Sequence, residues 1–212
     1  MTARLAIAAA AFAVFLPAVG AQATPVGARV EADAIIRAAG AGDLFENVTT
    51  GTSPEVRHRA SGLVCEFEPG ALDNRITIDA TRWRSEDVAC ETRVLGALQT
   101  QSIVRKPAAF SLDDMFDYFL SDIARAHPDA RPAKGGFAVA KSQGGPALPE
   151  RRTRRLTYAA DGQESFARLS VAQVGDWIVE QRVTAQAKDA FAADLAAEIA
   201  LASNLSQAAA RR

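Results

Sequence analysis

The sequence predicts an α+β protein in which an antiparallel sheet of about six to seven strands is flanked by two or three helices. Three observations carry this prediction. Short segments alternate apolar and polar side chains and are separated by glycine-containing turns, as in strands joined by hairpins. One strongly amphipathic helical pattern interrupts these segments, and a second helical pattern closes the chain.

The composition is that of a folded chain without a strong charge. Apolar residues make up 49% of the 212, enough for a hydrophobic core. The formal net charge is only −1, so overall charge does not attract nucleic acid or an anionic membrane. We therefore expect no nucleic-acid partner, and we expect a monomer.

The first 23 residues have the pattern of a secretory signal peptide. Arg4 precedes an apolar run over residues 5–16, and Ala21-Gln22-Ala23 supplies the small residues that a signal peptidase reads. The run is shorter than the roughly 20 residues that a helix needs to span a bilayer. We therefore expect a protein that does not span the membrane and is exported to the periplasm or secreted.

The remaining chain is expected to form a single structural unit with short additions. A helix over residues 30–39 ends at Gly40 and Gly42, and a polar loop follows. The expected divisions are a signal peptide at 1–23, an N-terminal helix and loop at 24–60, an α+β domain at 61–204 and a flexible C-terminal tail at 205–212.

The first strands follow this loop. Residues 62–68 and 75–82 alternate apolar and polar side chains with a period of two, as half-buried strands do. Residues 87–95 and 98–104 are predicted to form two more strands joined around Gly96.

The helix that follows is the clearest element in the sequence. Ser111 is a favourable N-cap, with Asp114 three residues later as a capping-box partner. The pair His127-Pro128 ends the helix. Its apolar residues recur at spacings of three and four, and are Leu112, Met115, Phe116, Phe119, Leu120 and Ile123.

Three strands and a helix close the chain. After a glycine- and proline-rich loop with a short strand at 137–140, strands are predicted at 151–159, 164–174 and 177–184. Asp161-Gly162 and Gly175-Asp176 give the turns between them. The last helix is predicted over 187–203. The residues of this helix that we expect to face inward are Phe191, Leu195, Ile199 and Ala202.

The order of these motifs resembles that of the PsbP-like α+β domains. An opening element contains Gly62, Phe67, Pro69 and Gly70, although the tryptophan that usually follows is missing. The closing hairpin, strand and helix of the family are matched by Thr157-Tyr158, Asp161-Gly162, residues 179–184 and a helix ending at Ser203-Asn204. The resemblance covers about residues 61–204. It implies a fold and a non-catalytic accessory or binding role, and it transfers no catalytic residue.

The two cysteines are predicted to form a disulfide. Cys65 and Cys90 each lie on the apolar face of a predicted strand, and export delivers them to an oxidising compartment. Neighbouring strands of one sheet would bring them within reach of each other. The alternatives are two buried free thiols or a redox-active pair, and the absence of a C-x-x-C motif disfavours the second.

The search for catalytic chemistry is negative. The sequence contains none of the common hydrolase, metalloprotease or nucleotide-binding motifs, so no catalytic residue, metal ligand or cofactor is assigned. His58, between Arg57 and Arg59, is expected at the surface. The acidic residues of the amphipathic helix (Asp113, Asp114, Asp117 and Asp122) are expected on its solvated face.

A run of arginines at 151–155 is the sharpest local anomaly. In a strand, Arg152 and Arg154 share a face with Tyr158, and this trio is our candidate anion-binding site. The alternative is an edge strand that charge protects from aggregation.

These patterns predict an exported soluble protein of the cell envelope with a non-catalytic binding or accessory role. Its partner would be an envelope protein or an anionic ligand. One alternative is a periplasmic hydrolase or transferase that uses acids such as Asp79 or Glu91. A second is a protein that binds anionic lipid or polymer through the basic strand.

Overall fold

The computed structural model describes residues 23–79, 86–136 and 148–209, and these ranges confirm the α+β class. They contain a seven-stranded antiparallel sheet, a three-stranded antiparallel sheet and three α-helices. The expected signal peptide lies outside them, apart from Ala23. In chain order the elements are α1 (Pro25–Ala38), β1 (Phe45–Asn47), β2 (Glu55–His58), β3 (Val64–Glu66), β4 (Arg75–Ile78), β5 (Asp87–Val94), β6 (Ala97–Arg105), α2 (Leu112–Ala126), β7 (Arg131–Pro132), β8 (Arg151–Ala160), β9 (Gln163–Val174), β10 (Trp177–Gln186), the short 3₁₀ helix η1 (Ala187–Asp189) and α3 (Ala190–Ala209).

The large sheet has the strand order β4-β5-β6-β10-β9-β8-β7. Its three predicted hairpins are confirmed, between β5 and β6, β8 and β9, and β9 and β10. Asp161 and Gly162 have φ values of 51° and 75°, and a two-residue type I′ turn requires such positive values. The predicted strand at 137–140 and the end of the one predicted at 75–82 lie outside the described residues.

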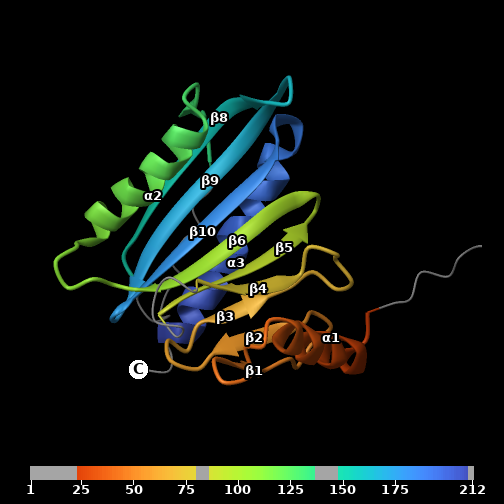
Figure 1. Cartoon of the computed structure of the whole chain (residues 1–212). Helices are drawn as coiled ribbons and strands as arrows, with labels where there is room; N and C mark the ends of the chain where they lie inside the picture. Colours follow the sequence, from red (N-terminus) through yellow and green to blue (C-terminus); the bar gives the residue numbers. More distant parts are fainter. Residues whose placement is uncertain (1–22, 80–85, 137–147, 210–212) are drawn as a thin grey trace, which may run out of the picture.

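Helix α2 covers one face of the large sheet, over β8, β9 and β10 (Figure 1). Ser111 and Asp114 form the predicted capping box. The apolar side chains predicted to face inward pack on Leu169, Val171 and Ile178 of the sheet, which confirms the predicted buried face. Those buried on α2 are Leu112, Met115, Phe116, Phe119 and Ile123.

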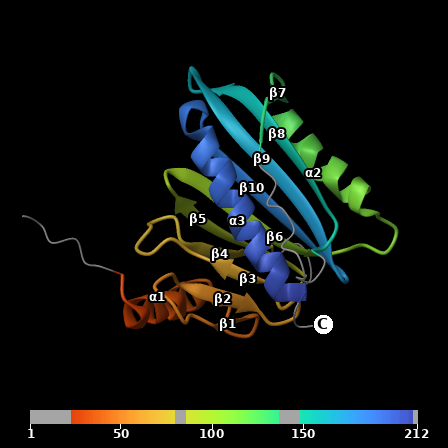
Figure 2. The same ribbon diagram turned by 180° about the vertical axis from the view of Figure 1, so that it is seen from behind.

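Helix α3 covers the opposite face (Figure 2), but its buried side was predicted wrongly. Phe191 and Ile199 are 67% and 55% exposed. The charged residues Asp194 and Glu198 are buried instead, because they pair with arginines of the sheet. The helix also continues to Ala209 with Leu205 fully buried, so the predicted flexible tail does not start at residue 205.

Strands β1, β2 and β3 form the small sheet, against which α1 packs. Because β2 pairs with β3, the predicted boundary at residue 61 falls inside this sheet. The first two of these strands were not predicted. They are short, and only the alternation of Val56 and His58 marks the second.

The predicted disulfide between Cys65 and Cys90 is present, with the Cα atoms 6.2 Å apart. It joins β3 of the small sheet to β5 of the large one, so our expectation of two strands in one sheet was wrong. Closing a loop over 25 residues of sequence stabilises the fold by about 3 kcal/mol in the chain-entropy model.

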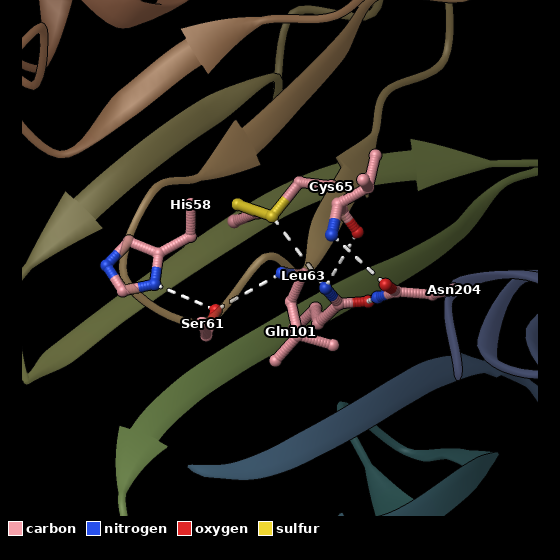
Figure 3. The surroundings of a disulfide bond; sticks show 8 residues. His58, Ser61, Leu63, Cys65, Gln101 and Asn204 are labelled. Atoms are coloured by element: carbon pink, nitrogen blue, oxygen red, sulfur yellow. Dashed lines mark hydrogen bonds between the residues drawn. A yellow bond between two sulfur atoms is a disulfide. The ribbon is translucent and has the colours of Figure 1, made fainter. Parts of the chain in front are cut away.

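Two buried amides reinforce this junction (Figure 3). Gln101 Nε2 donates to the Val64 carbonyl at 3.1 Å, and Asn204 Oδ1 accepts from the Val64 amide at 3.0 Å. Asn204 Nδ2 donates to Gln101 Oε1, also at 3.0 Å. Helix α3 is thereby tied to both sheets around the disulfide.

Candidate functional site

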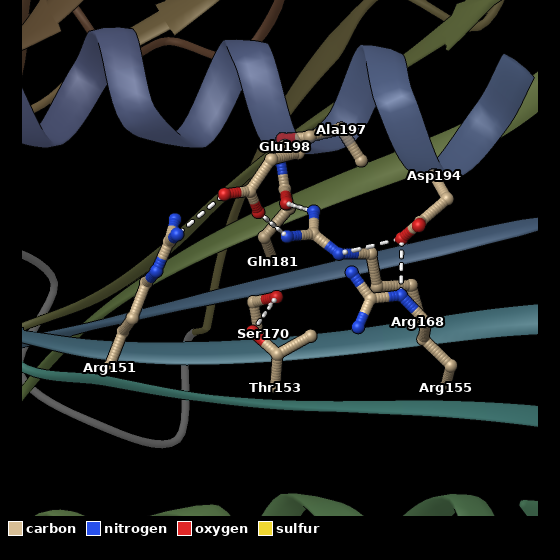
Figure 4. Close-up of polar contacts among 9 residues, drawn as sticks. All are labelled: Arg151, Thr153, Arg155, Arg168, Ser170, Gln181, Asp194, Ala197 and Glu198. Atoms are coloured by element: carbon tan, nitrogen blue, oxygen red, sulfur yellow. Dashed lines mark hydrogen bonds and ion pairs between the residues drawn. The ribbon is translucent and has the colours of Figure 1, made fainter. Parts of the chain in front are cut away.

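A network of charged side chains lies buried between α3 and the large sheet (Figure 4). At its centre is Arg168 of β9, whose side chain is fully buried. Its guanidinium forms an ion pair with Glu198, donates to Gln181 Oε1 at 2.8 Å, and has Nε 3.2 Å from Asp194 Oδ1. Burial lowers the pKa of Arg168 to about 10, so this residue remains charged at neutral pH.

Two more arginines join the network from β8. Arg151 forms an ion pair with Glu198, and Arg155 Nε donates to Asp194 Oδ1 at 2.8 Å. The carboxylates lie four residues apart on α3, which places both on the helix face toward the sheet. Each carboxylate therefore contacts two guanidiniums, which offsets the cost of removing its charge from water.

At its Arg155 end the network opens into a cleft of about 580 Å³, which we call the basic cleft. This volume is within the range of about 300–1,000 Å³ typical of small-ligand sites. The cleft lies between the β7–β8 edge of the sheet and the start of α3. Its lining residues are Arg131, Pro132, Ala133, Lys134, Gly135, Gly136, Arg155, Thr157, Glu164, Phe166, Ala187, Lys188, Ala190, Phe191 and Asp194.

The charges of the basic cleft do not balance. Arg131 is paired with Glu164 at 2.7 Å, and Arg155 with Asp194 at 2.8 Å. Lys134 and Lys188 are exposed, and neither has a hydrogen bond or ion pair in the part of the chain that the structure describes. Two lysines without such a partner therefore line the same cleft.

Gly136 is required where the chain passes Arg155. Its φ is +142°, and a Cβ at this position would lie 2.3 Å from the Arg155 guanidinium carbon. A side chain would therefore displace Arg155 from its ion pair with Asp194. The missing side chain at Gly136 lets the backbone and the guanidinium pack together at one wall of the cleft.

The candidate anion site of Arg152, Arg154 and Tyr158 stays a prediction. Arg152 forms ion pairs with Asp113 at 2.7 Å and Glu150 at 2.9 Å, and the bond to Asp113 raises the pKa of Arg152. Arg154 is exposed on the same strand. Tyr158 lies in the core beneath α2, stacked on His127 with ring centroids 3.8 Å apart.

The acids named for a hydrolase lie on the α2 side of the sheet. Glu91 is held in an ion pair with Arg75. Asp79 lines a cleft of about 300 Å³ beside α2, together with Tyr118 and Glu180. The two candidate acids therefore differ in environment, and only Asp79 borders this cleft.

His58 is buried, which corrects the expected surface position. Alternation along β2 turns Val56 and His58 inward. The imidazole lies between Phe45 and Trp177, with ring centroids 5.2 Å from each, and its Nδ1 is 2.9 Å from Ser61 Oγ. This burial lowers the pKa of His58 from 6.5 to about 4.

This burial predicts a loss of stability in mild acid. Between pH 6.5 and 4 the unfolded chain binds a proton at His58 that the folded chain does not. The free energy of unfolding should therefore decrease as pH falls through this window, by roughly 2 to 3 kcal/mol in total. Denaturant melts across the window should show this slope, and the slope should be reduced in His58→Phe. His127→Gln is the matched control. A slope in His58→Phe as steep as that of the wild type would contradict the assignment.

The helix acids have structural roles. Asp114 caps α2, and its hydrogen bonds with Ser111 lower its pKa. Asp113 pairs with Arg152, and Asp122 with Arg125. Within the described ranges, no three His, Cys, Asp or Glu side chains are grouped as metal ligands.

Sequence reasoning missed both the buried network and the basic cleft. Two signals for the network were present. Arg168 is the only basic residue of β9 and lies between Ala167 and Leu169, and Asp194 and Glu198 are the only charges in α3, four residues apart. No comparable signal marks the cleft, because Lys134, Arg155 and Lys188 are brought together only by the tertiary fold.

Comparisons with known proteins leave the family open. No family model matches the chain, and no curated protein matches it. Among solved structures, the fold is similar to that of the Ran-binding protein Mog1p of Saccharomyces cerevisiae. The TM-score is 0.41 and the identity 12%, over 75% of this chain and 93% of Mog1p. The resemblance to PsbP-like domains is not confirmed.

Proposed function

We propose that this chain is an exported, non-catalytic binding protein of the cell envelope that holds a ligand in the basic cleft. The observation that carries the proposal is the cleft itself. It combines ligand-sized volume, an apolar wall that includes Phe166 and Phe191, and a few charged groups. Concave sites of this composition are typical of small-ligand binding.

The setting of the charged groups supports binding over catalysis. Asp194, the carboxylate that borders the cleft from α3, is held by the guanidiniums of Arg155 and Arg168. Such pairing fixes the carboxylate in place, whereas a general acid or base must reach the substrate to exchange a proton with it.

Export is supported by two features. The N-terminal sequence has the charge, apolar run and small residues of a signal peptide. The disulfide between Cys65 and Cys90 belongs to an oxidising compartment. None of the described helices combines the length and apolar character needed to cross a membrane.

Filling the basic cleft should remove a bound ligand. We expect native mass spectrometry of the protein purified from the envelope to show an added mass. Thr157→Trp and Ala187→Trp, which introduce an indole from β8 and from η1, should lose this mass because the indole occupies the ligand's space. Thr100→Trp, on the large sheet but outside the cleft, is the matched control.

Melting midpoints establish that each variant is folded. A folded cleft-filling variant that keeps the added mass would contradict the proposal. So would a wild-type protein that carries no added mass after purification from the envelope.

Two alternative functions remain proposals. A hydrolase or transferase would use Asp79 in the cleft beside α2. Binding of anionic lipid or polymer through the basic strand would depend on Arg154, since Arg152 is held by Asp113 and Glu150.

A further inference from the structure

We propose that the ligand of the basic cleft is a small anionic amphiphile, with a carboxylate or phosphate head and an apolar body. This inference rests on the proposed function, and it adds the chemical class of the ligand. The head would lie between Lys134 and Lys188, and the body along the apolar wall.

The head is assigned from the charges of the cleft. Four cationic and two anionic side chains line it, and both anions are already paired with arginines. The ammonium groups of Lys134 and Lys188 come from separate elements, the loop after β7 and η1. Both are free to make charge-assisted hydrogen bonds, for which carboxylate and phosphate are the matching acceptors.

A further feature favours an anion. The first turn of α3 lines the cleft at Ala190 and Phe191, where the helix dipole is positive.

The body is assigned from the apolar wall. Phe166 is 3% exposed and forms a fixed surface, whereas Phe191 is 67% exposed and leaves apolar area in contact with water. An apolar ligand body would cover this area, and burial of apolar surface is favourable. A small inorganic anion would leave the wall uncovered.

The test is a titration of the purified protein with each of four probes, in which isothermal titration calorimetry measures binding. Dodecanoate has both head and body, acetate has the head alone, and dodecyltrimethylammonium joins a similar body to a cation. Vesicles of phosphatidylglycerol present the same chemistry as a membrane surface. We expect dodecanoate to bind below its micelle concentration, and each other probe to bind about tenfold more weakly or not at all.

The double variant Lys134→Ala/Lys188→Ala should bind dodecanoate about tenfold more weakly than wild type, because it loses two charge-assisted contacts. Lys106→Ala is the matched control, since Lys106 lies outside the cleft and donates to the Phe110 carbonyl. Lys134 and Lys188 are both exposed, so the melting midpoint of the double variant should equal that of wild type.

Unchanged affinity in the double variant would overturn the proposal, as would equal binding of the cationic probe or binding to vesicles alone. If the envelope ligand is lost in Thr157→Trp but kept in the double lysine variant, the cleft binds a ligand of another class. The proposed function would then stand without this inference.

Discussion

Replacing Arg168 with leucine should lower the free energy of unfolding by about 3–5 kcal/mol, the range for breaking a buried ion pair by removing one partner. The fully buried guanidinium of Arg168 contacts Glu198, Asp194 and Gln181. Its loss leaves two buried carboxylates with fewer partners and one amide oxygen without its donor. Chemical denaturation at neutral pH measures the change.

The matched control is Arg93→Leu. Arg93 pairs with Asp73 at 2.6 Å, but its side chain is 46% exposed, so its loss should cost less than about 1 kcal/mol. Arg168→Lys should give an intermediate loss, because an ammonium keeps the charge but cannot reach all three partners in one plane. Equal losses for the leucine variants at 168 and 93 would show that the buried network is not the stabilising feature described.

Phe119→Ala should also cost about 3–5 kcal/mol, the range for truncating a buried aromatic residue. Phe119 is 8% exposed and lies in the core between α2 and the sheet. The change removes apolar contacts and leaves a cavity that rigid strands cannot close. Denaturant melts of wild type and variant give the difference directly.

Asp117→Ala tests the same helix on its solvated face. Asp117 is exposed, and its replacement should be nearly silent. Comparable losses at positions 117 and 119 would mean that α2 presents a different face to the sheet.

The fold was predictable where local patterns and burial agree. In α2 the apolar residues recur at helical spacing, Ser111 supplies the cap, and the same residues are buried. The hairpin at Asp161-Gly162 follows from backbone preference alone. Such elements need no knowledge of distant parts of the chain.

Helix α3 shows where this reasoning stops. Its apolar residues Phe191 and Ile199 have helical spacing, yet they face solvent. Asp194 and Glu198 are buried instead, because arginines of β8 and β9 offset the cost of removing their charges from water. Pairing between residues that lie far apart in the sequence leaves no local pattern. The same holds for the disulfide. Because the chain has only two cysteines, the sequence predicts their pairing, but it does not predict that the bond joins two different sheets.

The candidate site was less predictable than the fold. The arginine run at 151–155 is unusual in the sequence, and strand alternation predicts a candidate site at Arg152 and Arg154 on one strand face. The structure places Arg155, on the other face, at the wall of the basic cleft. That cleft also requires the loop at Gly136 and the start of α3, which only the tertiary fold brings to Arg155.

The most direct test of ligand binding in the basic cleft is to locate a bound ligand on the folded protein. Amide chemical shifts of the ¹⁵N-labelled chain, recorded during titration with dodecanoate, report which residues contact it. We expect the largest changes at Lys134, Lys188 and Phe191, and none at Tyr118 of α2, which covers the other face of the sheet. Changes centred on Tyr118, or no changes at Lys134 and Lys188, would contradict the assignment of the basic cleft as the binding site.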